Sequence, residues 1–170
     1  MDLIRRSSPE SLLDAAALAK LLPAADPIGT ADLLFAERDP EQSPIRAAAA
    51  DRIKTASMRE GVSPAEWDES GIEETQRRWT ADGPAGRTAA IAGYARWRSE
   101  LAQMAVLAHP QHRGAGCAYA AAAVATQEAL GEGLIPQWRS RQGNEASRRL
   151  AQHVGFTQLG IQAAVALTRQ

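Results

Sequence analysis

Hydrophobic and polar positions in the middle of the chain follow the order strand, turn, helix, strand. An apolar run at 101–107 is suited to a buried strand, and His109-Pro110 ends it because proline cannot donate to a β-ladder. A glycine turn at 111–116 leads into an alanine-rich stretch that favours a helix to Leu130, and a second apolar run covers 134–138. This order predicts a βαβ unit with two neighbouring parallel strands.

Helix-opening signals recur before this unit. Ser8 and Ser43 each precede a proline, and Ser63 and Glu66 have the spacing of a capping box. A loop rich in glycine and proline at 81–86 indicates a β-hairpin. We therefore expect helices over residues 9–22, 44–61 and 64–71, and strands over 31–36, 75–80 and 88–97.

The chain after this unit is predicted to form one more helix and two strand pieces. Asn144 is a good N-cap, and Gly155 suits the residue after a helix end, with Phe156 placed for the apolar contact that accompanies it. Gly160 separates the two strand pieces, and the last one is expected to end near Thr168. Antiparallel strands, a βαβ unit and flanking helices together indicate an α/β (α+β) chain.

The length, composition and charge of the sequence limit the classes of protein to which it could belong. A length of 170 residues predicts one domain over 1–170, and 45% hydrophobic with 23% charged residues is typical of globular proteins. The net charge of −1 gives no electrostatic reason to expect nucleic acid or an anionic membrane as partner. Cys117 is the lone cysteine, no signal peptide pattern opens the sequence, and the alanine run at 118–125 is too short to span a bilayer. We expect a cytoplasmic protein.

The glycine turn is the first candidate for chemistry. A helix start offers unpaired N–H groups and a positive dipole to an anion, and Gly114 and Gly116 would let the backbone approach a phosphate, with Arg113 adding charge. A plain tight turn is an equally good interpretation of Gly-x-Gly alone. A dinucleotide fingerprint is excluded because Tyr119 stands where a third glycine is needed, and a P-loop because Gly-Lys-Ser/Thr is absent.

These motifs resemble those of the GCN5-related N-acetyltransferase (GNAT) family. Gln111-x-x-Gly114-x-Gly116 is similar to its acyl-coenzyme A motif, and the segment from Asn144 to Gly155-Phe156 is similar to its second motif at the usual spacing. Gly133-Leu134-Ile135-Pro136-Gln137-Trp138 resembles a strand of a bacterial subgroup. The resemblance covers about 86–168. It implies a GNAT fold with a mixed central sheet, in which residues 1–85 form the variable acceptor side and 86–168 the cofactor half.

The resemblance also implies acetyl-CoA as cofactor and assigns residues to it. Backbone N–H groups at the end of the first βαβ strand would hold the thioester and pantetheine, the glycine turn the pyrophosphate, and the next helix start another part of the cofactor. For Asn144 a plain helix cap is the alternative, and the two roles are compatible. The cofactor-binding set is Val106, Leu107, Ala108, Gln111, His112, Arg113, Gly114, Ala115, Gly116, Cys117, Asn144 and Ser147.

Catalytic groups are harder to assign. Glu100, at the start of the strand that leads to the cofactor, and His109, at its end, are candidate bases. Glu100 is equally plausible as a solvated turn residue, and for His109 an exposed loop histidine is favoured. Many family members carry a tyrosine as general acid seven residues after the asparagine, and Ala151 occupies that position here. Cys117 lies at a helix start, which could lower its pKa, but a small residue packed beside a turn is favoured. No histidine spacing indicates a metal site.

Three functions follow from these expectations. The leading one is an acetyl-CoA-dependent N-acetyltransferase that acts on a primary amine of a small molecule or a protein. The second, indicated by Ala151, is a non-catalytic acyl-CoA-binding or sensing module. The third, another nucleotide-binding βαβ protein, is disfavoured by the two missing phosphate-loop motifs. A homodimer is a possible assembly, and no metal, nucleic acid or membrane partner is expected.

Overall fold

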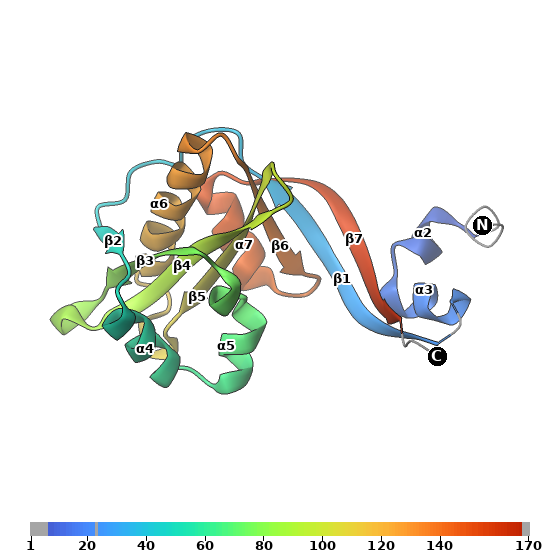
Figure 1. Ribbon diagram of the computed structural model, residues 1–170, viewed down its shortest axis with the longest axis horizontal. Coiled ribbons are helices and arrows are strands. Elements are labelled where there is room, and N and C mark those ends of the chain that lie inside the picture. The colour runs from blue at the N-terminus through green and yellow to red at the C-terminus, as the bar shows by residue number, and fades with distance from the viewer. Residues whose placement is uncertain (1–6, 23, 168–170) are drawn as a thin grey trace.

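A computed structural model describes residues 7–22 and 24–167, and within them seven strands form one mixed sheet in the order β2-β3-β4-β5-β6-β1-β7 (Figure 1). The predicted meander is present, because β3, β4 and β5 pair antiparallel, and β5 and β6 form the parallel pair of the predicted βαβ unit. The strands are β1 (Ala25–Phe35), β2 (Ala47–Ala49), β3 (Arg77–Asp82), β4 (Thr88–Trp97), β5 (Leu101–Ala108), β6 (Ile135–Arg141) and β7 (Thr157–Leu167).

Helices cover both faces of this sheet (Figure 1). On one face α6 and α7 pack over a large core, and on the other α4, α5 and the turn η1 cover a smaller one. The helices are α2 (Pro9–Leu12), α3 (Ala15–Leu21), α4 (Arg52–Glu60), α5 (Pro64–Ser70), α6 (Cys117–Gly131) and α7 (Glu145–Val154), and the 3₁₀ turns are η1 (Ile72–Glu74), η2 (Pro84–Gly86) and η3 (Pro110–His112). No helix in the described part of the chain is long and apolar enough to cross a membrane.

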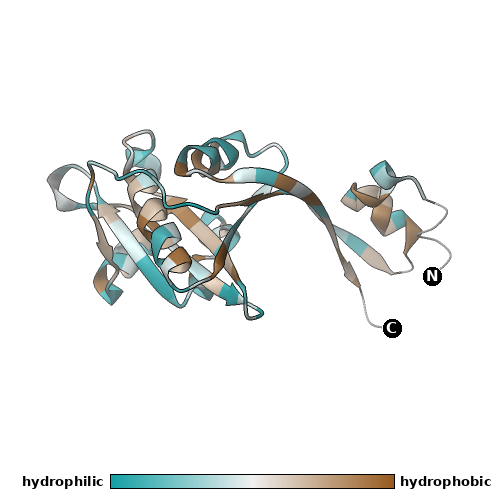
Figure 2. Cartoon of the chain, turned by 90° about the horizontal axis from the view of Figure 1, so that it is seen from above, coloured by the Kyte–Doolittle hydropathy of each residue, from teal (hydrophilic) through white to brown (hydrophobic). Residues whose placement is uncertain are grey.

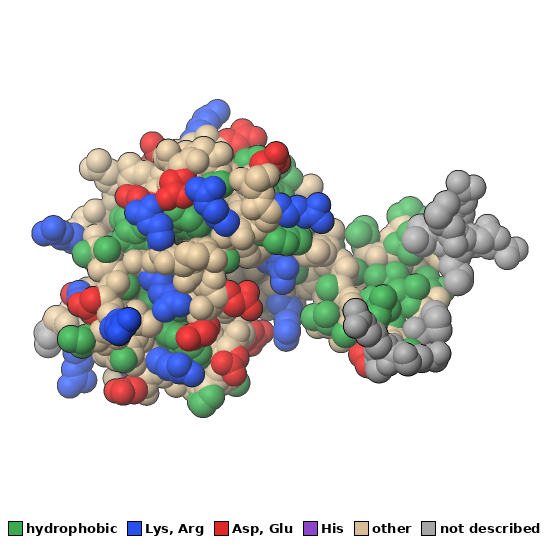
Figure 3. Space-filling view, viewed as in Figure 1, with side chains coloured by type: hydrophobic (Ala, Val, Ile, Leu, Met, Phe, Trp, Pro, Cys, Tyr) green, Lys and Arg blue, Asp and Glu red, His purple; other side chains and the backbone are tan. Residues whose placement is uncertain are grey.

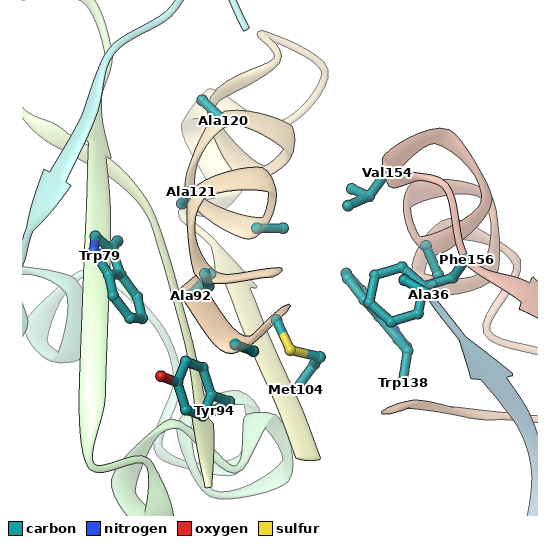
Figure 4. Packing of buried hydrophobic residues seen from close by; sticks show 14 of the residues in the cluster. Ala36, Trp79, Ala92, Tyr94, Met104, Ala120, Ala121, Trp138, Val154 and Phe156 are labelled. Carbon is teal, nitrogen blue, oxygen red and sulfur yellow. The ribbon is translucent and has the colours of Figure 1, made fainter. Parts of the chain in front are cut away.

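Small and aromatic side chains share the large core. The buried face of α6 is mostly alanine, including Ala120 and Ala121, so this helix lies close to β4 (Figure 4). Trp79 stacks on Tyr94 with ring centroids 5.8 Å apart, and both rings point toward α6 (Figure 4). Burying such aromatic area supplies much of the stabilisation that alanine cannot. This packing holds β5 and α6, the two elements that flank the glycine turn.

Two of the helices predicted in the N-terminal half differ from the structure. The expected helix over 9–22 is divided into α2 and α3, because Asp14 accepts a hydrogen bond from the Ala17 N–H at 2.7 Å and caps a new helix. The expected helix over 44–61 starts only at Arg52, where Asp51 is the cap. Ser43 instead accepts from the N–H of Ile45 in a local turn, and the chain then extends into β2.

The last predicted strands are longer and continuous. Residues 157–167 form one strand across Gly160, with an irregularity in the pairing where Leu159 has no partner on β1. The expected end near Thr168 lies outside the described residues. β1, predicted at 31–36, begins at Ala25 and inserts between β6 and β7, antiparallel to both. The outer parts of β1 and β7 leave the sheet as a two-stranded ribbon with α2 and α3 at its tip (Figures 1 and 2).

Candidate active site

A cavity of about 530 Å³ opens where two parallel strands separate. β5 and β6 pair only between residues 101–103 and 135–137, and beyond Gln103 the strands diverge. The outer part of β1, the α5–η1 segment and the start of α7 complete the walls. The lining residues are 28–31, Glu66, 68–71, Glu74, Ala95, 103–107, Arg113, Trp138, Arg139, Arg141, Asn144, Ser147, Gln162 and Ala164.

The divergence leaves one edge of β5 free. Residues 104–108 keep their antiparallel pairing with β4, but beyond Gln103 no described strand pairs with the opposite edge of β5. Alternate backbone N–H and C=O groups of this edge are therefore available to an extended ligand. Val106 and Leu107 line the cavity, whereas Ala108, at the strand end, does not.

The glycine turn lies between β5 and α6 and presents unpartnered backbone donors. Gly114 and Gly116 have φ of 78° and 80°, a left-handed geometry that turns successive N–H groups to the same side. The N–H groups of 113–116 have no acceptor among the residues that the structure describes. Those of Gln111 and His112 are occupied, because the first donates to Nδ1 and the second to the carbonyl oxygen of His109. The turn can thus bind an anion through 113–116 at the positive end of a helix of 15 residues.

An ion pair joins this turn to α5. Arg113 lies 2.7 Å from Oε1 of Glu66, whose other oxygen closes the predicted capping box with Ser63. Hydrogen bonds from Ser63 and then from Arg113 lower the pKa of Glu66. Both side chains are substantially exposed, so the pair adds little to stability but fixes Arg113 at the cavity wall.

Cys117 does not have the activated thiol that a helix start could give. Its side chain is buried under the turn, and Sγ lies 3.8 Å from the carbonyl oxygen of Asp82. Burial raises the pKa of the Cys117 thiol, and the charge of Asp82 raises it further. The small-residue interpretation of Cys117 fits this environment.

Asn144, Ser147 and Trp138 form a chain of hydrogen bonds along another wall. Asn144 Oδ1 accepts from the N–H of Ser147 at 3.1 Å, which is the predicted cap, and Ser147 Oγ accepts from Trp138 Nε1 at 3.0 Å. Trp138 is itself held edge-on by Phe156, with ring centroids 5.4 Å apart (Figure 4). Because Ser147 accepts from the indole, its hydroxyl proton remains free for a ligand in the cavity.

The position of the missing tyrosine lies in the large core. Ala151 is 0% exposed and follows Ser147 by one turn of α7. It does not line the cavity, and neither tyrosine, histidine nor cysteine occurs among the described lining residues. A proton donor to a leaving group must therefore be sought elsewhere.

The two candidate bases are not brought to the cavity lining. Glu100 is exposed on the turn between β4 and β5, and its carbonyl oxygen accepts from the N–H of Ile135 at the closed end of the strand pair. His109 caps η3: Nδ1 accepts from the N–H of Gln111 at 3.2 Å. The edge of its ring packs against Gly61 after α4, where an added Cβ would lie 2.4 Å from Nε2. Both ring nitrogens of His109 thus face protein groups.

Sequence reasoning missed an acidic segment, formed by α5 and η1, on the cavity wall next to the turn. Asp68, Glu69 and Glu74 of α5 and η1 line the cavity, and Figure 3 shows acidic side chains gathered over α5. Glu69 lies 3.5 Å from Arg141 of β6, whereas neither Asp68 nor Glu74 pairs with a described cation. The capping box at Ser63 and Glu66 predicts that this segment begins as a helix. No spacing in the sequence indicates that its carboxylates lie near β6.

Comparison with known proteins agrees with the architecture. Residues 87–161 match the model of the GNAT acetyltransferase family. No curated protein matches the chain in sequence. The fold is shared with solved structures of low identity, at TM-scores of 0.60–0.65.

Three of these solved structures cover most of this chain. A GNAT-family protein from Novosphingobium aromaticivorans is 21% identical over 84% of this chain and 66% of its own, with a TM-score of 0.65. An acetyltransferase of the GNAT family from Colwellia psychrerythraea has a TM-score of 0.61 and 15% identity, covering 84% of this chain and 57% of its own. A GCN5-related N-acetyltransferase from Kribbella flavida has a TM-score of 0.60 and 18% identity, covering 89% of this chain and 62% of its own. The chain thus spans less than two thirds of the length of each.

Proposed function

From a GNAT acetyltransferase region at 87–161 and a GNAT fold, we propose that this chain is an acetyl-CoA-dependent N-acetyltransferase. Its acceptor is a primary amine of a small molecule or a protein. The strand motif Gly133-Leu134-x-Pro136-x-Trp138, which lies at the start of β6, supports the bacterial subgroup. The single cysteine, Cys117, is buried and free, which is compatible with a protein that functions in a reducing cytoplasm.

One observation carries the proposal. The free edge of β5, where strands diverge, runs toward a turn with unpartnered N–H groups. An extended amide-containing arm that ends in a pyrophosphate needs these two features in this order: strand-like backbone partners, then an anion site at a helix start. Val106 and Leu107 of the cavity lining would hold the arm, the unpartnered N–H groups of 113–116 the pyrophosphate, and Asn144 and Ser147 another part of the cofactor.

The reaction requires three things of this chain: orientation of the thioester carbonyl, a proton acceptor and stabilisation of the leaving sulfur. Acetyl-CoA supplies an activated thioester. The amine nitrogen bonds to the carbonyl carbon as the carbon–sulfur bond breaks, and in this step the nitrogen loses a proton and the sulfur takes up negative charge. Backbone N–H groups of β5 orient the carbonyl, and Glu74 or Asp68 accepts the proton and passes it to solvent. Ser147 donates its free hydroxyl proton as a hydrogen bond to the sulfur, a role that requires no tyrosine at position 151.

The acidic segment supports an amine as acceptor. A protonated amine that enters beside Asp68, Glu69 and Glu74 is attracted by their charge before it must be deprotonated. The carboxylates of Asp68 and Glu74 are not neutralised by a described cation, so they remain available to such an acceptor.

The experiment has two arms that report separately. Calorimetry with acetyl-CoA measures cofactor binding, and release of free thiol is followed across a panel of primary amines and lysine peptides. We expect saturable binding and amine-dependent thiol release. Absence of binding by the folded protein would refute the cofactor assignment.

A specific observation favours one alternative function. Because no tyrosine, histidine or cysteine lies among the described lining residues, the chain has the features of a non-catalytic acyl-CoA-binding or sensing module. Saturable acetyl-CoA binding without thiol release for any amine would select this alternative over the enzyme.

A further inference from the structure

The charges on the cavity wall are only partly paired within the protein. Arg113 pairs with Glu66, and Arg141 pairs with Glu69. The other charged side chains of the lining have no oppositely charged partner among the described residues; they are Arg139, Asp68 and Glu74. The cavity therefore offers a ligand one free cation as well as free carboxylates.

The free cation lies on the same face of the sheet as the acidic segment. Trp138 packs in the large core under α6 and α7, and side chains alternate along a strand, so Arg139 points to the face that α4, α5 and η1 cover. Arg141 follows on that face, about 6.6 Å along β6, and its ion pair with Glu69 of α5 agrees with this direction. A ligand that reaches Asp68 or Glu74 thus has Arg139 on the same side of the sheet.

Arg141 can assist Arg139. Its ion pair with Glu69 has a distance of 3.5 Å, and the two side chains are 65% and 63% exposed. An exposed pair of this kind adds little to stability, so Arg141 can leave Glu69 for a ligand at small cost. Two guanidinium groups on alternate residues of one strand suit a carboxylate or a phosphate, because each presents a planar fork of donors.

Gln103 adds an unused acceptor to this face of the cavity. It lines the cavity where β5 and β6 begin to diverge, and its buried Oε1 accepts from no described donor. Gln137, its neighbour in the parallel register, is 4% exposed and has an unpaired Oε1 as well. Buried acceptors are rarely left unpaired, and an ammonium group carries three donors and no acceptor. The amide of Gln103 therefore suits the amine end of a ligand.

We propose that the acceptor is a small amine that also carries an anionic group, either a carboxylate or a phosphate. This inference rests on the proposed N-acetyltransferase function. Arg139, with Arg141 beside it, binds the anionic group through charge-assisted hydrogen bonds. Asp68 and Glu74 attract the ammonium group, and Gln103 accepts from one of its N–H groups. A neutral amine leaves Arg139 without a partner, so it is the poorer acceptor.

The first test compares amines in matched pairs. β-Alanine is paired with β-alaninamide, γ-aminobutyrate with γ-aminobutyramide, and phosphoethanolamine with ethanolamine, and thiol release is followed at steady state. We expect kcat/KM to be about 10- to 100-fold higher for the anionic member, the value of a hydrogen bond between charged groups. The first two pairs test a carboxylate and the third a phosphate. Equal kcat/KM within every pair overturns the proposal.

The second test assigns the preference to one residue. Arg139→Gln should lower kcat/KM for the anionic amines to the level of the neutral ones and leave acetyl-CoA affinity unchanged. Arg139→Lys, which keeps the charge but loses the planar fork, should retain part of the preference. Arg38→Gln is the matched control, because Arg38 is exposed in the loop after β1 and does not line the cavity. A preference that survives Arg139→Gln, or weaker cofactor binding in that variant, contradicts this role of Arg139.

A binding measurement separates this inference from the proposed function. The same pairs are titrated by calorimetry into the protein in the presence of CoA, which has no acetyl group to transfer. Tighter binding of the anionic member, lost in Arg139→Gln, supports the inference even when no amine gives thiol release, a result that would refute the transferase alone. Equal binding within every pair overturns the inference even when thiol release is observed.

Discussion

Two parts of the candidate site are built in different ways. The glycine turn, of which Arg113 lines the cavity, offers backbone N–H groups, and its shape depends on Gly114 and Gly116. The acidic segment offers the carboxylates of Asp68, Glu69 and Glu74, carried by α5 and η1, which meet β5 only in the folded chain. We expect the turn to tolerate few residue types and the acidic segment to tolerate many. Cofactor binding and acceptor choice should therefore respond very differently to substitution.

The largest expected effect is at the turn. Gly116→Glu should abolish acetyl-CoA binding, because φ of 80° disfavours a side chain, the added Cβ would lie 3.2 Å from Ile45 Cδ1, and the new carboxylate repels phosphate. Calorimetry is the measurement. Gly131→Glu is the matched control, since that glycine lies in α6 with open space around it. Unchanged affinity in folded Gly116→Glu would refute the anion site.

The acidic segment should respond in turnover and not in cofactor affinity. Glu74→Gln is expected to lower the rate of thiol release by roughly 10²-fold and to leave the acetyl-CoA dissociation constant unchanged, because it removes a proton acceptor. Glu100→Gln, for which sequence alone predicts the same loss, is the control on the exposed hairpin turn. A loss in Glu100→Gln without one in Glu74→Gln would restore Glu100 as the base. Asp68→Asn tests the neighbouring carboxylate in the same assay.

A smaller effect is expected at Ser147, in the cavity wall at the start of α7. Ser147→Ala removes the hydroxyl that accepts from Trp138 Nε1 and is proposed to donate to sulfur. We expect turnover to fall by about tenfold, the value of one hydrogen bond to a charged group. Ser147→Thr, which keeps the hydroxyl, should recover most of the rate in steady-state kinetics. Equal losses in both variants would show that packing, not the hydroxyl, matters.

The smallest effect on chemistry concerns the position where the family commonly has tyrosine. Because Ala151 is fully buried, Ala151→Tyr should cost about 1–3 kcal/mol of unfolding free energy through overpacking and should not raise turnover. Urea denaturation with parallel rate measurements tests this. Gln152→Tyr, one residue along on the exposed side of α7, should leave stability nearly unchanged. A faster, fully stable Ala151→Tyr enzyme would contradict this account.

The difference between local sequence rules and contacts distant in sequence explains which parts of the fold and the candidate site could be predicted. The βαβ unit, the meander and the cap at Asn144 follow local rules of periodicity, turn chemistry and capping, and the structure confirms them. The start of α4 was missed because a Ser-Pro signal at 43–44 competes with pairing of residues 47–49 to β3, a contact distant in sequence. The carboxylates of α5 and η1 in the cavity wall were missed for the same reason: no local pattern in the sequence indicates which strand a helix will face.

The insertion of β1 between β6 and β7 has a consequence for the order of folding. β1, at 25–35, pairs with residues more than 100 positions later, so these contacts carry a high loop-closure cost and form late. During synthesis, the meander and the βαβ unit are complete before β7 leaves the ribosome, and until then β1 lacks its outer neighbour. Refolding should accordingly show the meander gaining hydrogen-exchange protection before the ribbon, with the cavity wall at 28–31 among the last parts to form.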